Sequence, residues 1–85
     1  MKTDILNGLG TMTAIAIKNR ADTLEVAAKM DPAVGKARGF LLLDYGRILV
    51  STDPEFATEA EAEAHMREVI AACVEWGNAG MPHIG

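Results

Sequence analysis

The chain has 85 residues, of which 49% are hydrophobic, and a formal net charge of −4. This size and composition predict one globular domain over residues 1–85 and exclude a disordered protein, which would be poorer in apolar residues. The single cysteine excludes an internal disulfide, and no apolar run approaches the roughly 20 residues of a membrane span. We therefore expect a cytoplasmic protein without membrane association. The alternative of a secretory signal is disfavoured, because Asp4, Asn7 and two glycines interrupt the first apolar stretch.

The charge is divided unevenly along the chain. Residues 1–47 have a formal charge of +2, and residues 48–85 have a formal charge of −6. An acidic C-terminal half argues against nucleic-acid binding, which needs a basic face, and would suit docking on a basic protein surface. The other interpretation is a solvated helix face that keeps the protein soluble.

Residues 4–30 show polar and apolar stripes at the period of an α-helix. The stripes are Asp4, Asn7, Thr11, Lys18, Asp22, Glu25 and Lys29 on the polar side, and Ile5, Leu9, Met12, Ala16, Leu24, Ala27 and Met30 on the apolar side. We predict one helix, or two helices broken at residues 18–22, the second beginning at a capping box of Asp22 and Glu25. For residues 11–18 a strand is the alternative, because β-branched residues alternate there.

A β-hairpin is predicted in the centre of the chain. Asp31 and Pro32 end the helical segment, and residues 31–38 are expected to be a loop. Residues 39–43 and 47–51 flank a turn in which Gly46 adopts the left-handed conformation. The expected register pairs Leu43 with Arg47, Leu42 with Ile48, Leu41 with Leu49 and Phe40 with Val50. Both faces of this hairpin are apolar, so a further strand or a second copy of the chain should cover it.

A C-terminal helix is predicted from a capping box of Thr58 and Glu61 to about Gly77. Its apolar stripe consists of Ala62, Met66, Val69, Ile70, Cys73 and Val74. Glu63 and Arg67 have the spacing of an ion pair on one helix face. Residues 77–85 are expected to form a flexible tail.

These elements predict an α+β fold. An N-terminal helical segment precedes a central antiparallel β-hairpin, and the C-terminal helix packs on the sheet. A homodimer that joins two hairpins or two long helices would bury the second apolar face of the sheet.

No catalytic, cofactor or metal motif is present in the sequence. His65 and Cys73 lie about 80° apart around the predicted helix, so they cannot share a metal or act as base and nucleophile. Cys73 is expected in the core, and His65 is expected at the surface. We predict that the protein is not an enzyme and needs no cofactor or metal.

Three features are candidate partner-binding sites. The first is the acidic helix face of Glu61, Glu68 and Glu75, the second is Tyr45 at the hairpin tip, and the third is a basic point made by Lys36 and Arg38. Exposed aromatic residues often anchor interfaces, and charged faces can dock on surfaces of opposite sign. Each feature also has a purely structural explanation, as a solvated surface. Trp76 is expected to pack at the edge of the core.

A predicted strand ends in Ser51 and Thr52, and the helix after it is entered through Phe56 and Thr58. This pattern resembles the strand-turn-helix unit of the small YegP-like domains. It covers residues 46–52, 56–58 and 59–62. This resemblance implies a ββα packing unit and no catalytic residues. In size, acidity and lack of an active site, the chain also resembles small phage-encoded proteins such as anti-CRISPR proteins. That resemblance implies action by occupying a surface on a host complex.

The leading functional hypothesis is a non-enzymatic protein-binding module that inhibits or modulates a partner complex, for example a nucleoprotein complex of host defence. The alternative is a homodimeric structural domain, or one that binds a small ligand between its subunits. A ligand of that kind would raise the melting temperature.

Overall fold

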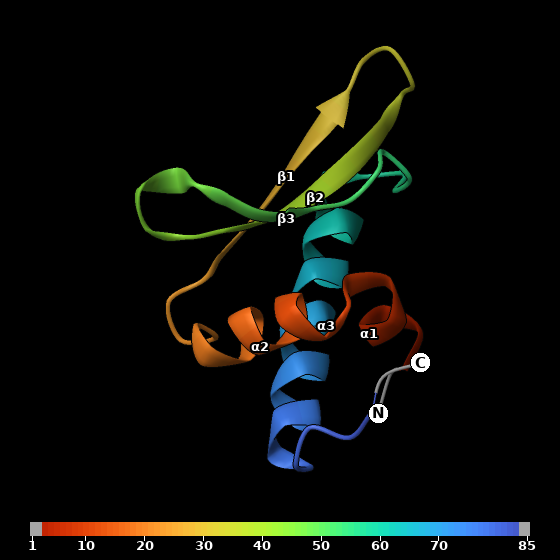
Figure 1. Ribbon diagram of the computed structural model, residues 1–85. Coiled ribbons are helices and arrows are strands. Elements are labelled where there is room, and N and C mark those ends of the chain that lie inside the picture. Colours follow the sequence, from red (N-terminus) through yellow and green to blue (C-terminus); the bar gives the residue numbers. More distant parts are fainter. Residues whose placement is uncertain (1–2, 84–85) are drawn as a thin grey trace. The chain divides into compact units, whose positions relative to one another are not determined.

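The computed structural model of the chain describes residues 3–83. Two short helices come first, α1 (Thr3–Leu9) and α2 (Thr11–Asn19). The strands β1 (Glu25–Asp31), β2 (Lys36–Leu42) and β3 (Ile48–Ser51) form one antiparallel sheet in the order β1-β2-β3, and α3 (Glu59–Asn78) ends the fold (Figure 1). The predicted α+β fold is confirmed, with an N-terminal helical segment, an antiparallel sheet and a C-terminal helix packed on it.

The contacts within the chain define two compact units that share α3. The sheet unit comprises residues 23–67, which include the three strands and the first part of α3. The helix unit comprises α1, α2 and the part of α3 that begins at Glu68. That residues 1–85 make a single domain stays a prediction.

The N-terminal helical segment is interrupted at Gly10. This glycine has a φ of 82°, which lies in the left-handed region and cannot continue a right-handed helix. α2 then runs through residues 11–18, so the helical interpretation of this stretch is confirmed and the strand alternative is wrong. The end of α2 at Asn19 agrees with the predicted break at residues 18–22.

The turn at Gly10 also changes which side chains of the N-terminal segment are buried. Leu6, Ala14 and Ile17 are buried, whereas Met12 is 82% exposed. The predicted apolar stripe through Met12 is therefore wrong, because α1 and α2 do not continue one helical period across Gly10.

Residues 25–31 form the strand β1 and not a helix. Each residue of β1 pairs with a residue of β2, from Glu25 opposite Leu42 to Asp31 opposite Lys36. The predicted capping box of Asp22 and Glu25 is wrong for the same reason. The helix preference of Ala, Lys and Met is worth only about 0.5 kcal/mol per residue, so pairing with β2 outweighs it.

A tight turn replaces most of the loop predicted for residues 31–38. Asp31 organises this turn, because its Oδ1 accepts a hydrogen bond of 2.9 Å from the Ala33 amide and its carbonyl oxygen accepts one of 2.8 Å from the Gly35 amide. Gly35 adopts a φ of 73°, which is the left-handed conformation that such a turn needs. Lys36 and Arg38 consequently belong to a strand.

The β2–β3 hairpin agrees with the prediction at its turn and differs further along. Leu42 pairs with Ile48, the Leu43 amide donates to the Arg47 carbonyl at 2.7 Å, and Gly46 has a φ of 74°. Beyond this point the observed pairs are Leu41 with Val50 and Phe40 with Ser51. The predicted pairs of Leu41 with Leu49 and Phe40 with Val50 are wrong, because a bulge between Leu41 and Leu42 shifts the register.

The first part of α3 packs on β2 at Gly39. A Cβ atom on Gly39 would lie 2.5 Å from Met66 Cγ, 2.8 Å from Met66 Sδ and 3.1 Å from the Ala62 carbonyl oxygen. Ala37, Gly39 and Leu41 alternate along β2 and are buried on this side. The helix thus covers one face of the sheet and needs a residue without a side chain at its closest approach.

Two hydrogen bonds fix the start of α3, one within the helix end and one to β1. The Thr58 hydroxyl accepts a hydrogen bond of 3.1 Å from the Glu61 amide, as expected for the predicted cap. The carboxylate of Glu59 accepts one of 2.9 Å from the Met30 amide and so ties the first turn of α3 to β1. Arg67 and Glu63 form the predicted ion pair at 3.3 Å.

The C-terminal end of α3 contacts the segment that follows it and a side chain of α2. Trp76 is 1% exposed, and its indole N–H donates to the Pro82 carbonyl at 2.8 Å. α3 ends at Asn78, one residue beyond the predicted end. The aliphatic stem of Lys18 lies against Gly77, where a Cβ would come within 2.6 Å of it. Residues 84 and 85 of the predicted tail lie outside the described residues.

The substitution Gly39→Ala should destabilise the protein by about 1–3 kcal/mol, because the new methyl group must displace Met66 or the α3 backbone. Urea unfolding followed by circular dichroism measures this change. Gly8→Ala is the control, since nothing lies within 4 Å of its Cβ position and alanine favours a helix by about 1 kcal/mol over glycine. Equal stability of the wild type and Gly39→Ala would contradict the close packing.

Candidate functional site

The face of the sheet opposite Met66 and Ala62 carries no buried side chain. We call it the open face. By strand alternation and register, it is formed by Glu25, Ala27, Lys29, Asp31, Lys36, Arg38, Phe40, Leu42 and Ile48. All of these residues are exposed or half-buried, whereas Ala37, Gly39 and Leu41 on the other face of β2 are buried.

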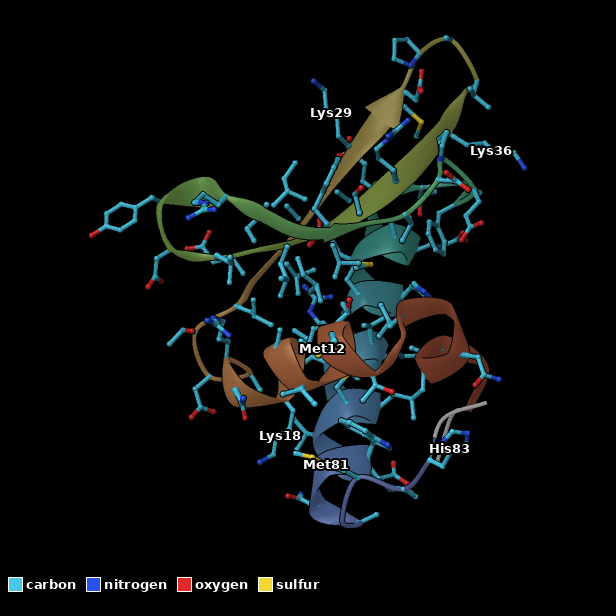
Figure 2. All side chains as sticks on the ribbon, in the orientation of Figure 1. Met12, Lys18, Lys29, Lys36, Met81 and His83 are labelled. Atoms are coloured by element: carbon cyan, nitrogen blue, oxygen red, sulfur yellow. The ribbon has the colours of Figure 1, made fainter. Side chains whose placement is uncertain are left out.

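One end of the open face is basic. Lys36 and Arg38 share this face of β2, and Lys29 lies directly opposite Arg38 on β1. Arg38 pairs with Asp31 at 3.4 Å, with side chains 37% and 26% exposed respectively. The side chain of Lys29 extends outward from β1, and that of Lys36 extends outward from β2 (Figure 2). They therefore offer separate contacts to an acidic partner rather than one converging anion site.

A small cavity lies beside this basic end. It has a volume of about 240 Å³ and is lined by Lys29, Met30, Asp31, Pro32 and Arg38. Pockets for cofactors and drug-sized ligands usually measure about 300–1,000 Å³. The cavity therefore fits a single side chain or a small anion better than a cofactor.

The other end of the open face is apolar, and the turn that contains Tyr45 follows it in the chain. Tyr45 is fully exposed at 102% and has a φ of 66°, which is strained for a residue with a side chain. Ile48 is 59% exposed and pairs with the half-buried Leu42. The exposed position predicted for Tyr45 is confirmed, and its contact with a partner stays a prediction.

The predicted acidic residues lie on α3. Glu61, Glu68 and Glu75 are all exposed and recur every seven residues, which keeps them on one side of the helix. Glu61 belongs to the sheet unit, and Glu68 and Glu75 belong to the helix unit. Glu68 and Glu75 also have interactions within the chain.

The six predicted partner-binding residues do not form one site. Lys36 begins β2 and Tyr45 follows its far end, so they are separated by about 20 Å of extended strand. Glu61 projects from the helix that covers the opposite face of the sheet. Only Lys36 and Arg38 are neighbours, as predicted, although they lie on a strand rather than in a loop.

Sequence reasoning missed Lys29 and Ile48 as members of the open face. Lys29 was assigned to a helical stripe, and its position opposite Arg38 becomes visible only once residues 25–31 pair with β2. A signal for this pairing was present, because Asp31, Pro32 and Gly35 are typical turn residues and lie between two runs with apolar residues. Ile48 was placed on an apolar face that was expected to be covered.

The residues considered for catalysis are separated from one another. Cys73 is buried, and burial raises the pKa of its thiol to about 11. His65 was predicted to be exposed and is instead half-buried, with its ring centroid 5.1 Å from that of Phe56. Among residues 3–83, no group of three or more His, Cys, Asp or Glu side chains could hold a metal ion. Over the same residues, no helix has the length and apolarity required to span a membrane.

Comparisons of the chain with protein-family models, curated proteins and solved structures found no match. The resemblances to YegP-like domains and to anti-CRISPR proteins therefore stay predictions.

Cys73 should resist alkylation by iodoacetamide at pH 8 in the folded protein and react once urea unfolds it, because its thiol is buried and protonated. Mass spectrometry measures the labelled fraction. The folded-state pKa of Cys73, about 11, exceeds the ordinary value of 9.0. The folded state is therefore favoured by keeping this thiol protonated. This contribution to the free energy of unfolding is complete below about pH 9 and declines as the pH rises toward 11. Rapid labelling of the folded chain would contradict this burial.

Proposed function

We propose that the protein is a non-enzymatic protein-binding module that acts by occupying a surface of its partner through the open face and the turn at Tyr45. The observation that carries this proposal is the fully exposed Tyr45, held at a φ of 66° in the turn before β3, whose first residue, Ile48, is also exposed. Exposed aromatic side chains at protruding positions often anchor interfaces, because they offer a large apolar contact area together with a polar group.

The charges on the open face support a partner with mixed chemistry. An apolar groove of the partner would receive Tyr45 and Ile48, and acidic side chains would meet Lys36 and Arg38 at the other end of β2. Because the two ends differ in character, a partner can dock in only one direction along the face. Such a pattern favours specificity over simple hydrophobic association.

The proposed class of partner follows from the resemblance of the chain, in size and acidity, to small phage-encoded proteins. We propose that the chain inhibits a nucleoprotein complex of host defence, as phage-encoded anti-CRISPR proteins do. Support comes from the net charge of −4 and from the exposed Glu61, Glu68 and Glu75 on α3, which suit the basic surfaces of nucleic-acid-binding subunits. In this proposal α3 makes a second contact, separate from the open face.

Tyr45→Ala should weaken capture of the specific partner by about tenfold or more, since loss of a central aromatic anchor typically costs about 2 kcal/mol. Affinity purification from host lysate with quantitative mass spectrometry identifies the partner, and titration then measures its affinity. Met12→Gln is the matched control, because Met12 is also exposed but lies in α2, outside the open face.

Equal losses for Tyr45→Ala and Met12→Gln would show nonspecific hydrophobic capture and would contradict the proposal. A partner that the wild type and Tyr45→Ala bind with the same affinity would also contradict it.

The triple change of Glu61, Glu68 and Glu75 to Gln should reduce the association rate with the partner several-fold at low salt and have little effect at 1 M salt, where the Debye length is about 3 Å. Stopped-flow or biolayer measurements at two salt concentrations test this effect. An unchanged rate at low salt would remove the acidic face from the proposal and leave the open face as the only contact.

A further inference from the structure

The outer edge of β1 presents unpaired backbone groups. The Met30 amide donates to Glu59 rather than to β2, and its register partner Ala37 exchanges hydrogen bonds with Phe56. Met30 and Ala37 are therefore a pair without mutual hydrogen bonds. Pairs of this kind recur at every second residue of an antiparallel ladder, so Val26 and Ala28 belong to the same kind of pair as Met30. Their N–H and C=O groups therefore also point away from β2.

Nothing in the described part of the chain satisfies the outward amides of Val26 and Ala28. β1 is an edge strand with seven residues, without proline and without a bulge. Natural proteins usually protect such an edge, because it is a template for pairing with another strand. Here the protection is limited to the Met30 end, where Glu59 covers the amide.

The charges of β1 are complementary to those of a second, antiparallel β1. Glu25, Ala27 and Lys29 follow one another on the open face. When Ala27 lies opposite Ala27 of the other copy on a twofold axis, Glu25 of each copy lies opposite Lys29 of the other. Among the described residues, neither Glu25 nor Lys29 has an ion-pair partner within its own chain.

We propose that two copies of this chain associate by antiparallel pairing of their β1 edges, with Ala27 at the twofold axis. Val26 of each copy exchanges backbone hydrogen bonds with Ala28 of the other, which satisfies the outward groups. The pairing also places an acidic group beside Lys29, whose opposite neighbour on β2 is the like-charged Arg38.

Neighbouring registers are less favourable. A shift that centres Ala28 brings Glu25 opposite Asp31, which is also acidic. It also pairs Met30 with Val26 of the other copy, and that pairing needs the Met30 amide, which already donates to Glu59. A shift that centres Val26 brings Glu25 opposite Ala27 and loses both ion pairs. The Glu59 contact and the charge order of β1 therefore select one register.

Pairing at β1 leaves the β3 edge and Tyr45 unoccupied, because they lie on the far side of β2. The two sheets become one continuous sheet, and their open faces lie side by side. A dimer of this kind presents two copies of the partner-binding surface. It does not depend on that surface having a partner, so the two proposals can fail separately.

A charge-reversal series tests the pairing by sedimentation over a range of protein concentrations. Glu25→Lys and Lys29→Glu each place like charges opposite one another twice and should weaken the dimer about tenfold or more. The double variant restores both Glu25–Lys29 ion pairs with the charges exchanged. Its dimer dissociation constant should return to within about threefold of the wild-type value. Lys36→Glu is the matched control, because it changes the net charge as Lys29→Glu does but lies on β2.

A wild type that remains monomeric at about 1 mM would overturn the proposal. Equal weakening by Lys29→Glu and Lys36→Glu, or failure of the double variant to recover, would also overturn it. Circular dichroism of each variant separates loss of the dimer from loss of folding.

A disulfide test examines the register directly. Ala27→Cys places two thiols opposite each other at the axis, in a pair whose Cα atoms lie about 4.5 Å apart, within the range that a disulfide spans. Mild oxidation should cross-link this variant at low concentration. Ala33→Cys, in the exposed turn, is the control for random collision, and the buried Cys73 should not react in either variant. Cross-linking of both variants at equal rates would overturn the proposed register.

Discussion

The contact of Gly39 with Met66 and Ala62 is the constraint on which the sheet unit depends. The backbone of β2 meets the α3 backbone and the Met66 side chain at distances that leave no space for a Cβ atom. This contact decides which face of the sheet is covered, and strand alternation then assigns every other side chain of β2. Ala37 and Leu41 join the covered face, and Lys36, Arg38, Phe40 and Leu42 remain on the open face.

The exposed surfaces of the sheet are consequences of what this packing leaves uncovered. The register shift between Leu41 and Leu42 places Val50 opposite Leu41, while Ile48, opposite Leu42, stays on the open face. The turn at Asp31 sends the chain back from β1 into β2 and so sets Lys29 opposite Arg38. The open face, the tip of the β2–β3 hairpin and the β1 edge are three distinct places on one small sheet, and each has its own chemistry.

Much of the local structure could be predicted from the sequence because it depends on interactions between near neighbours. The Thr58 cap, the Glu63–Arg67 pair and the left-handed Gly46 each involve residues within four positions of one another. For residues 11–18 the sequence left helix and strand open, because β-branched residues alternate within a helical stripe, and the folded chain has a helix there. The exposure of individual candidate residues could be predicted as well, since that of Tyr45 follows from its place in a turn. Their arrangement could not be predicted, because Lys36 and Tyr45 lie at opposite ends of a strand whose start was placed three residues too late.

The sequence by itself determined the α+β class and the C-terminal helix, because periodicity and capping are local properties. Tertiary structure alone decided that residues 25–31 are a strand. Their Ala, Lys and Met residues favour a helix slightly, and the hydrogen bonds and side-chain contacts with β2 outweigh that preference. For the same reason, the open face and the β1 edge became visible only in the folded chain, since both are defined by residues that are distant in sequence and paired in space.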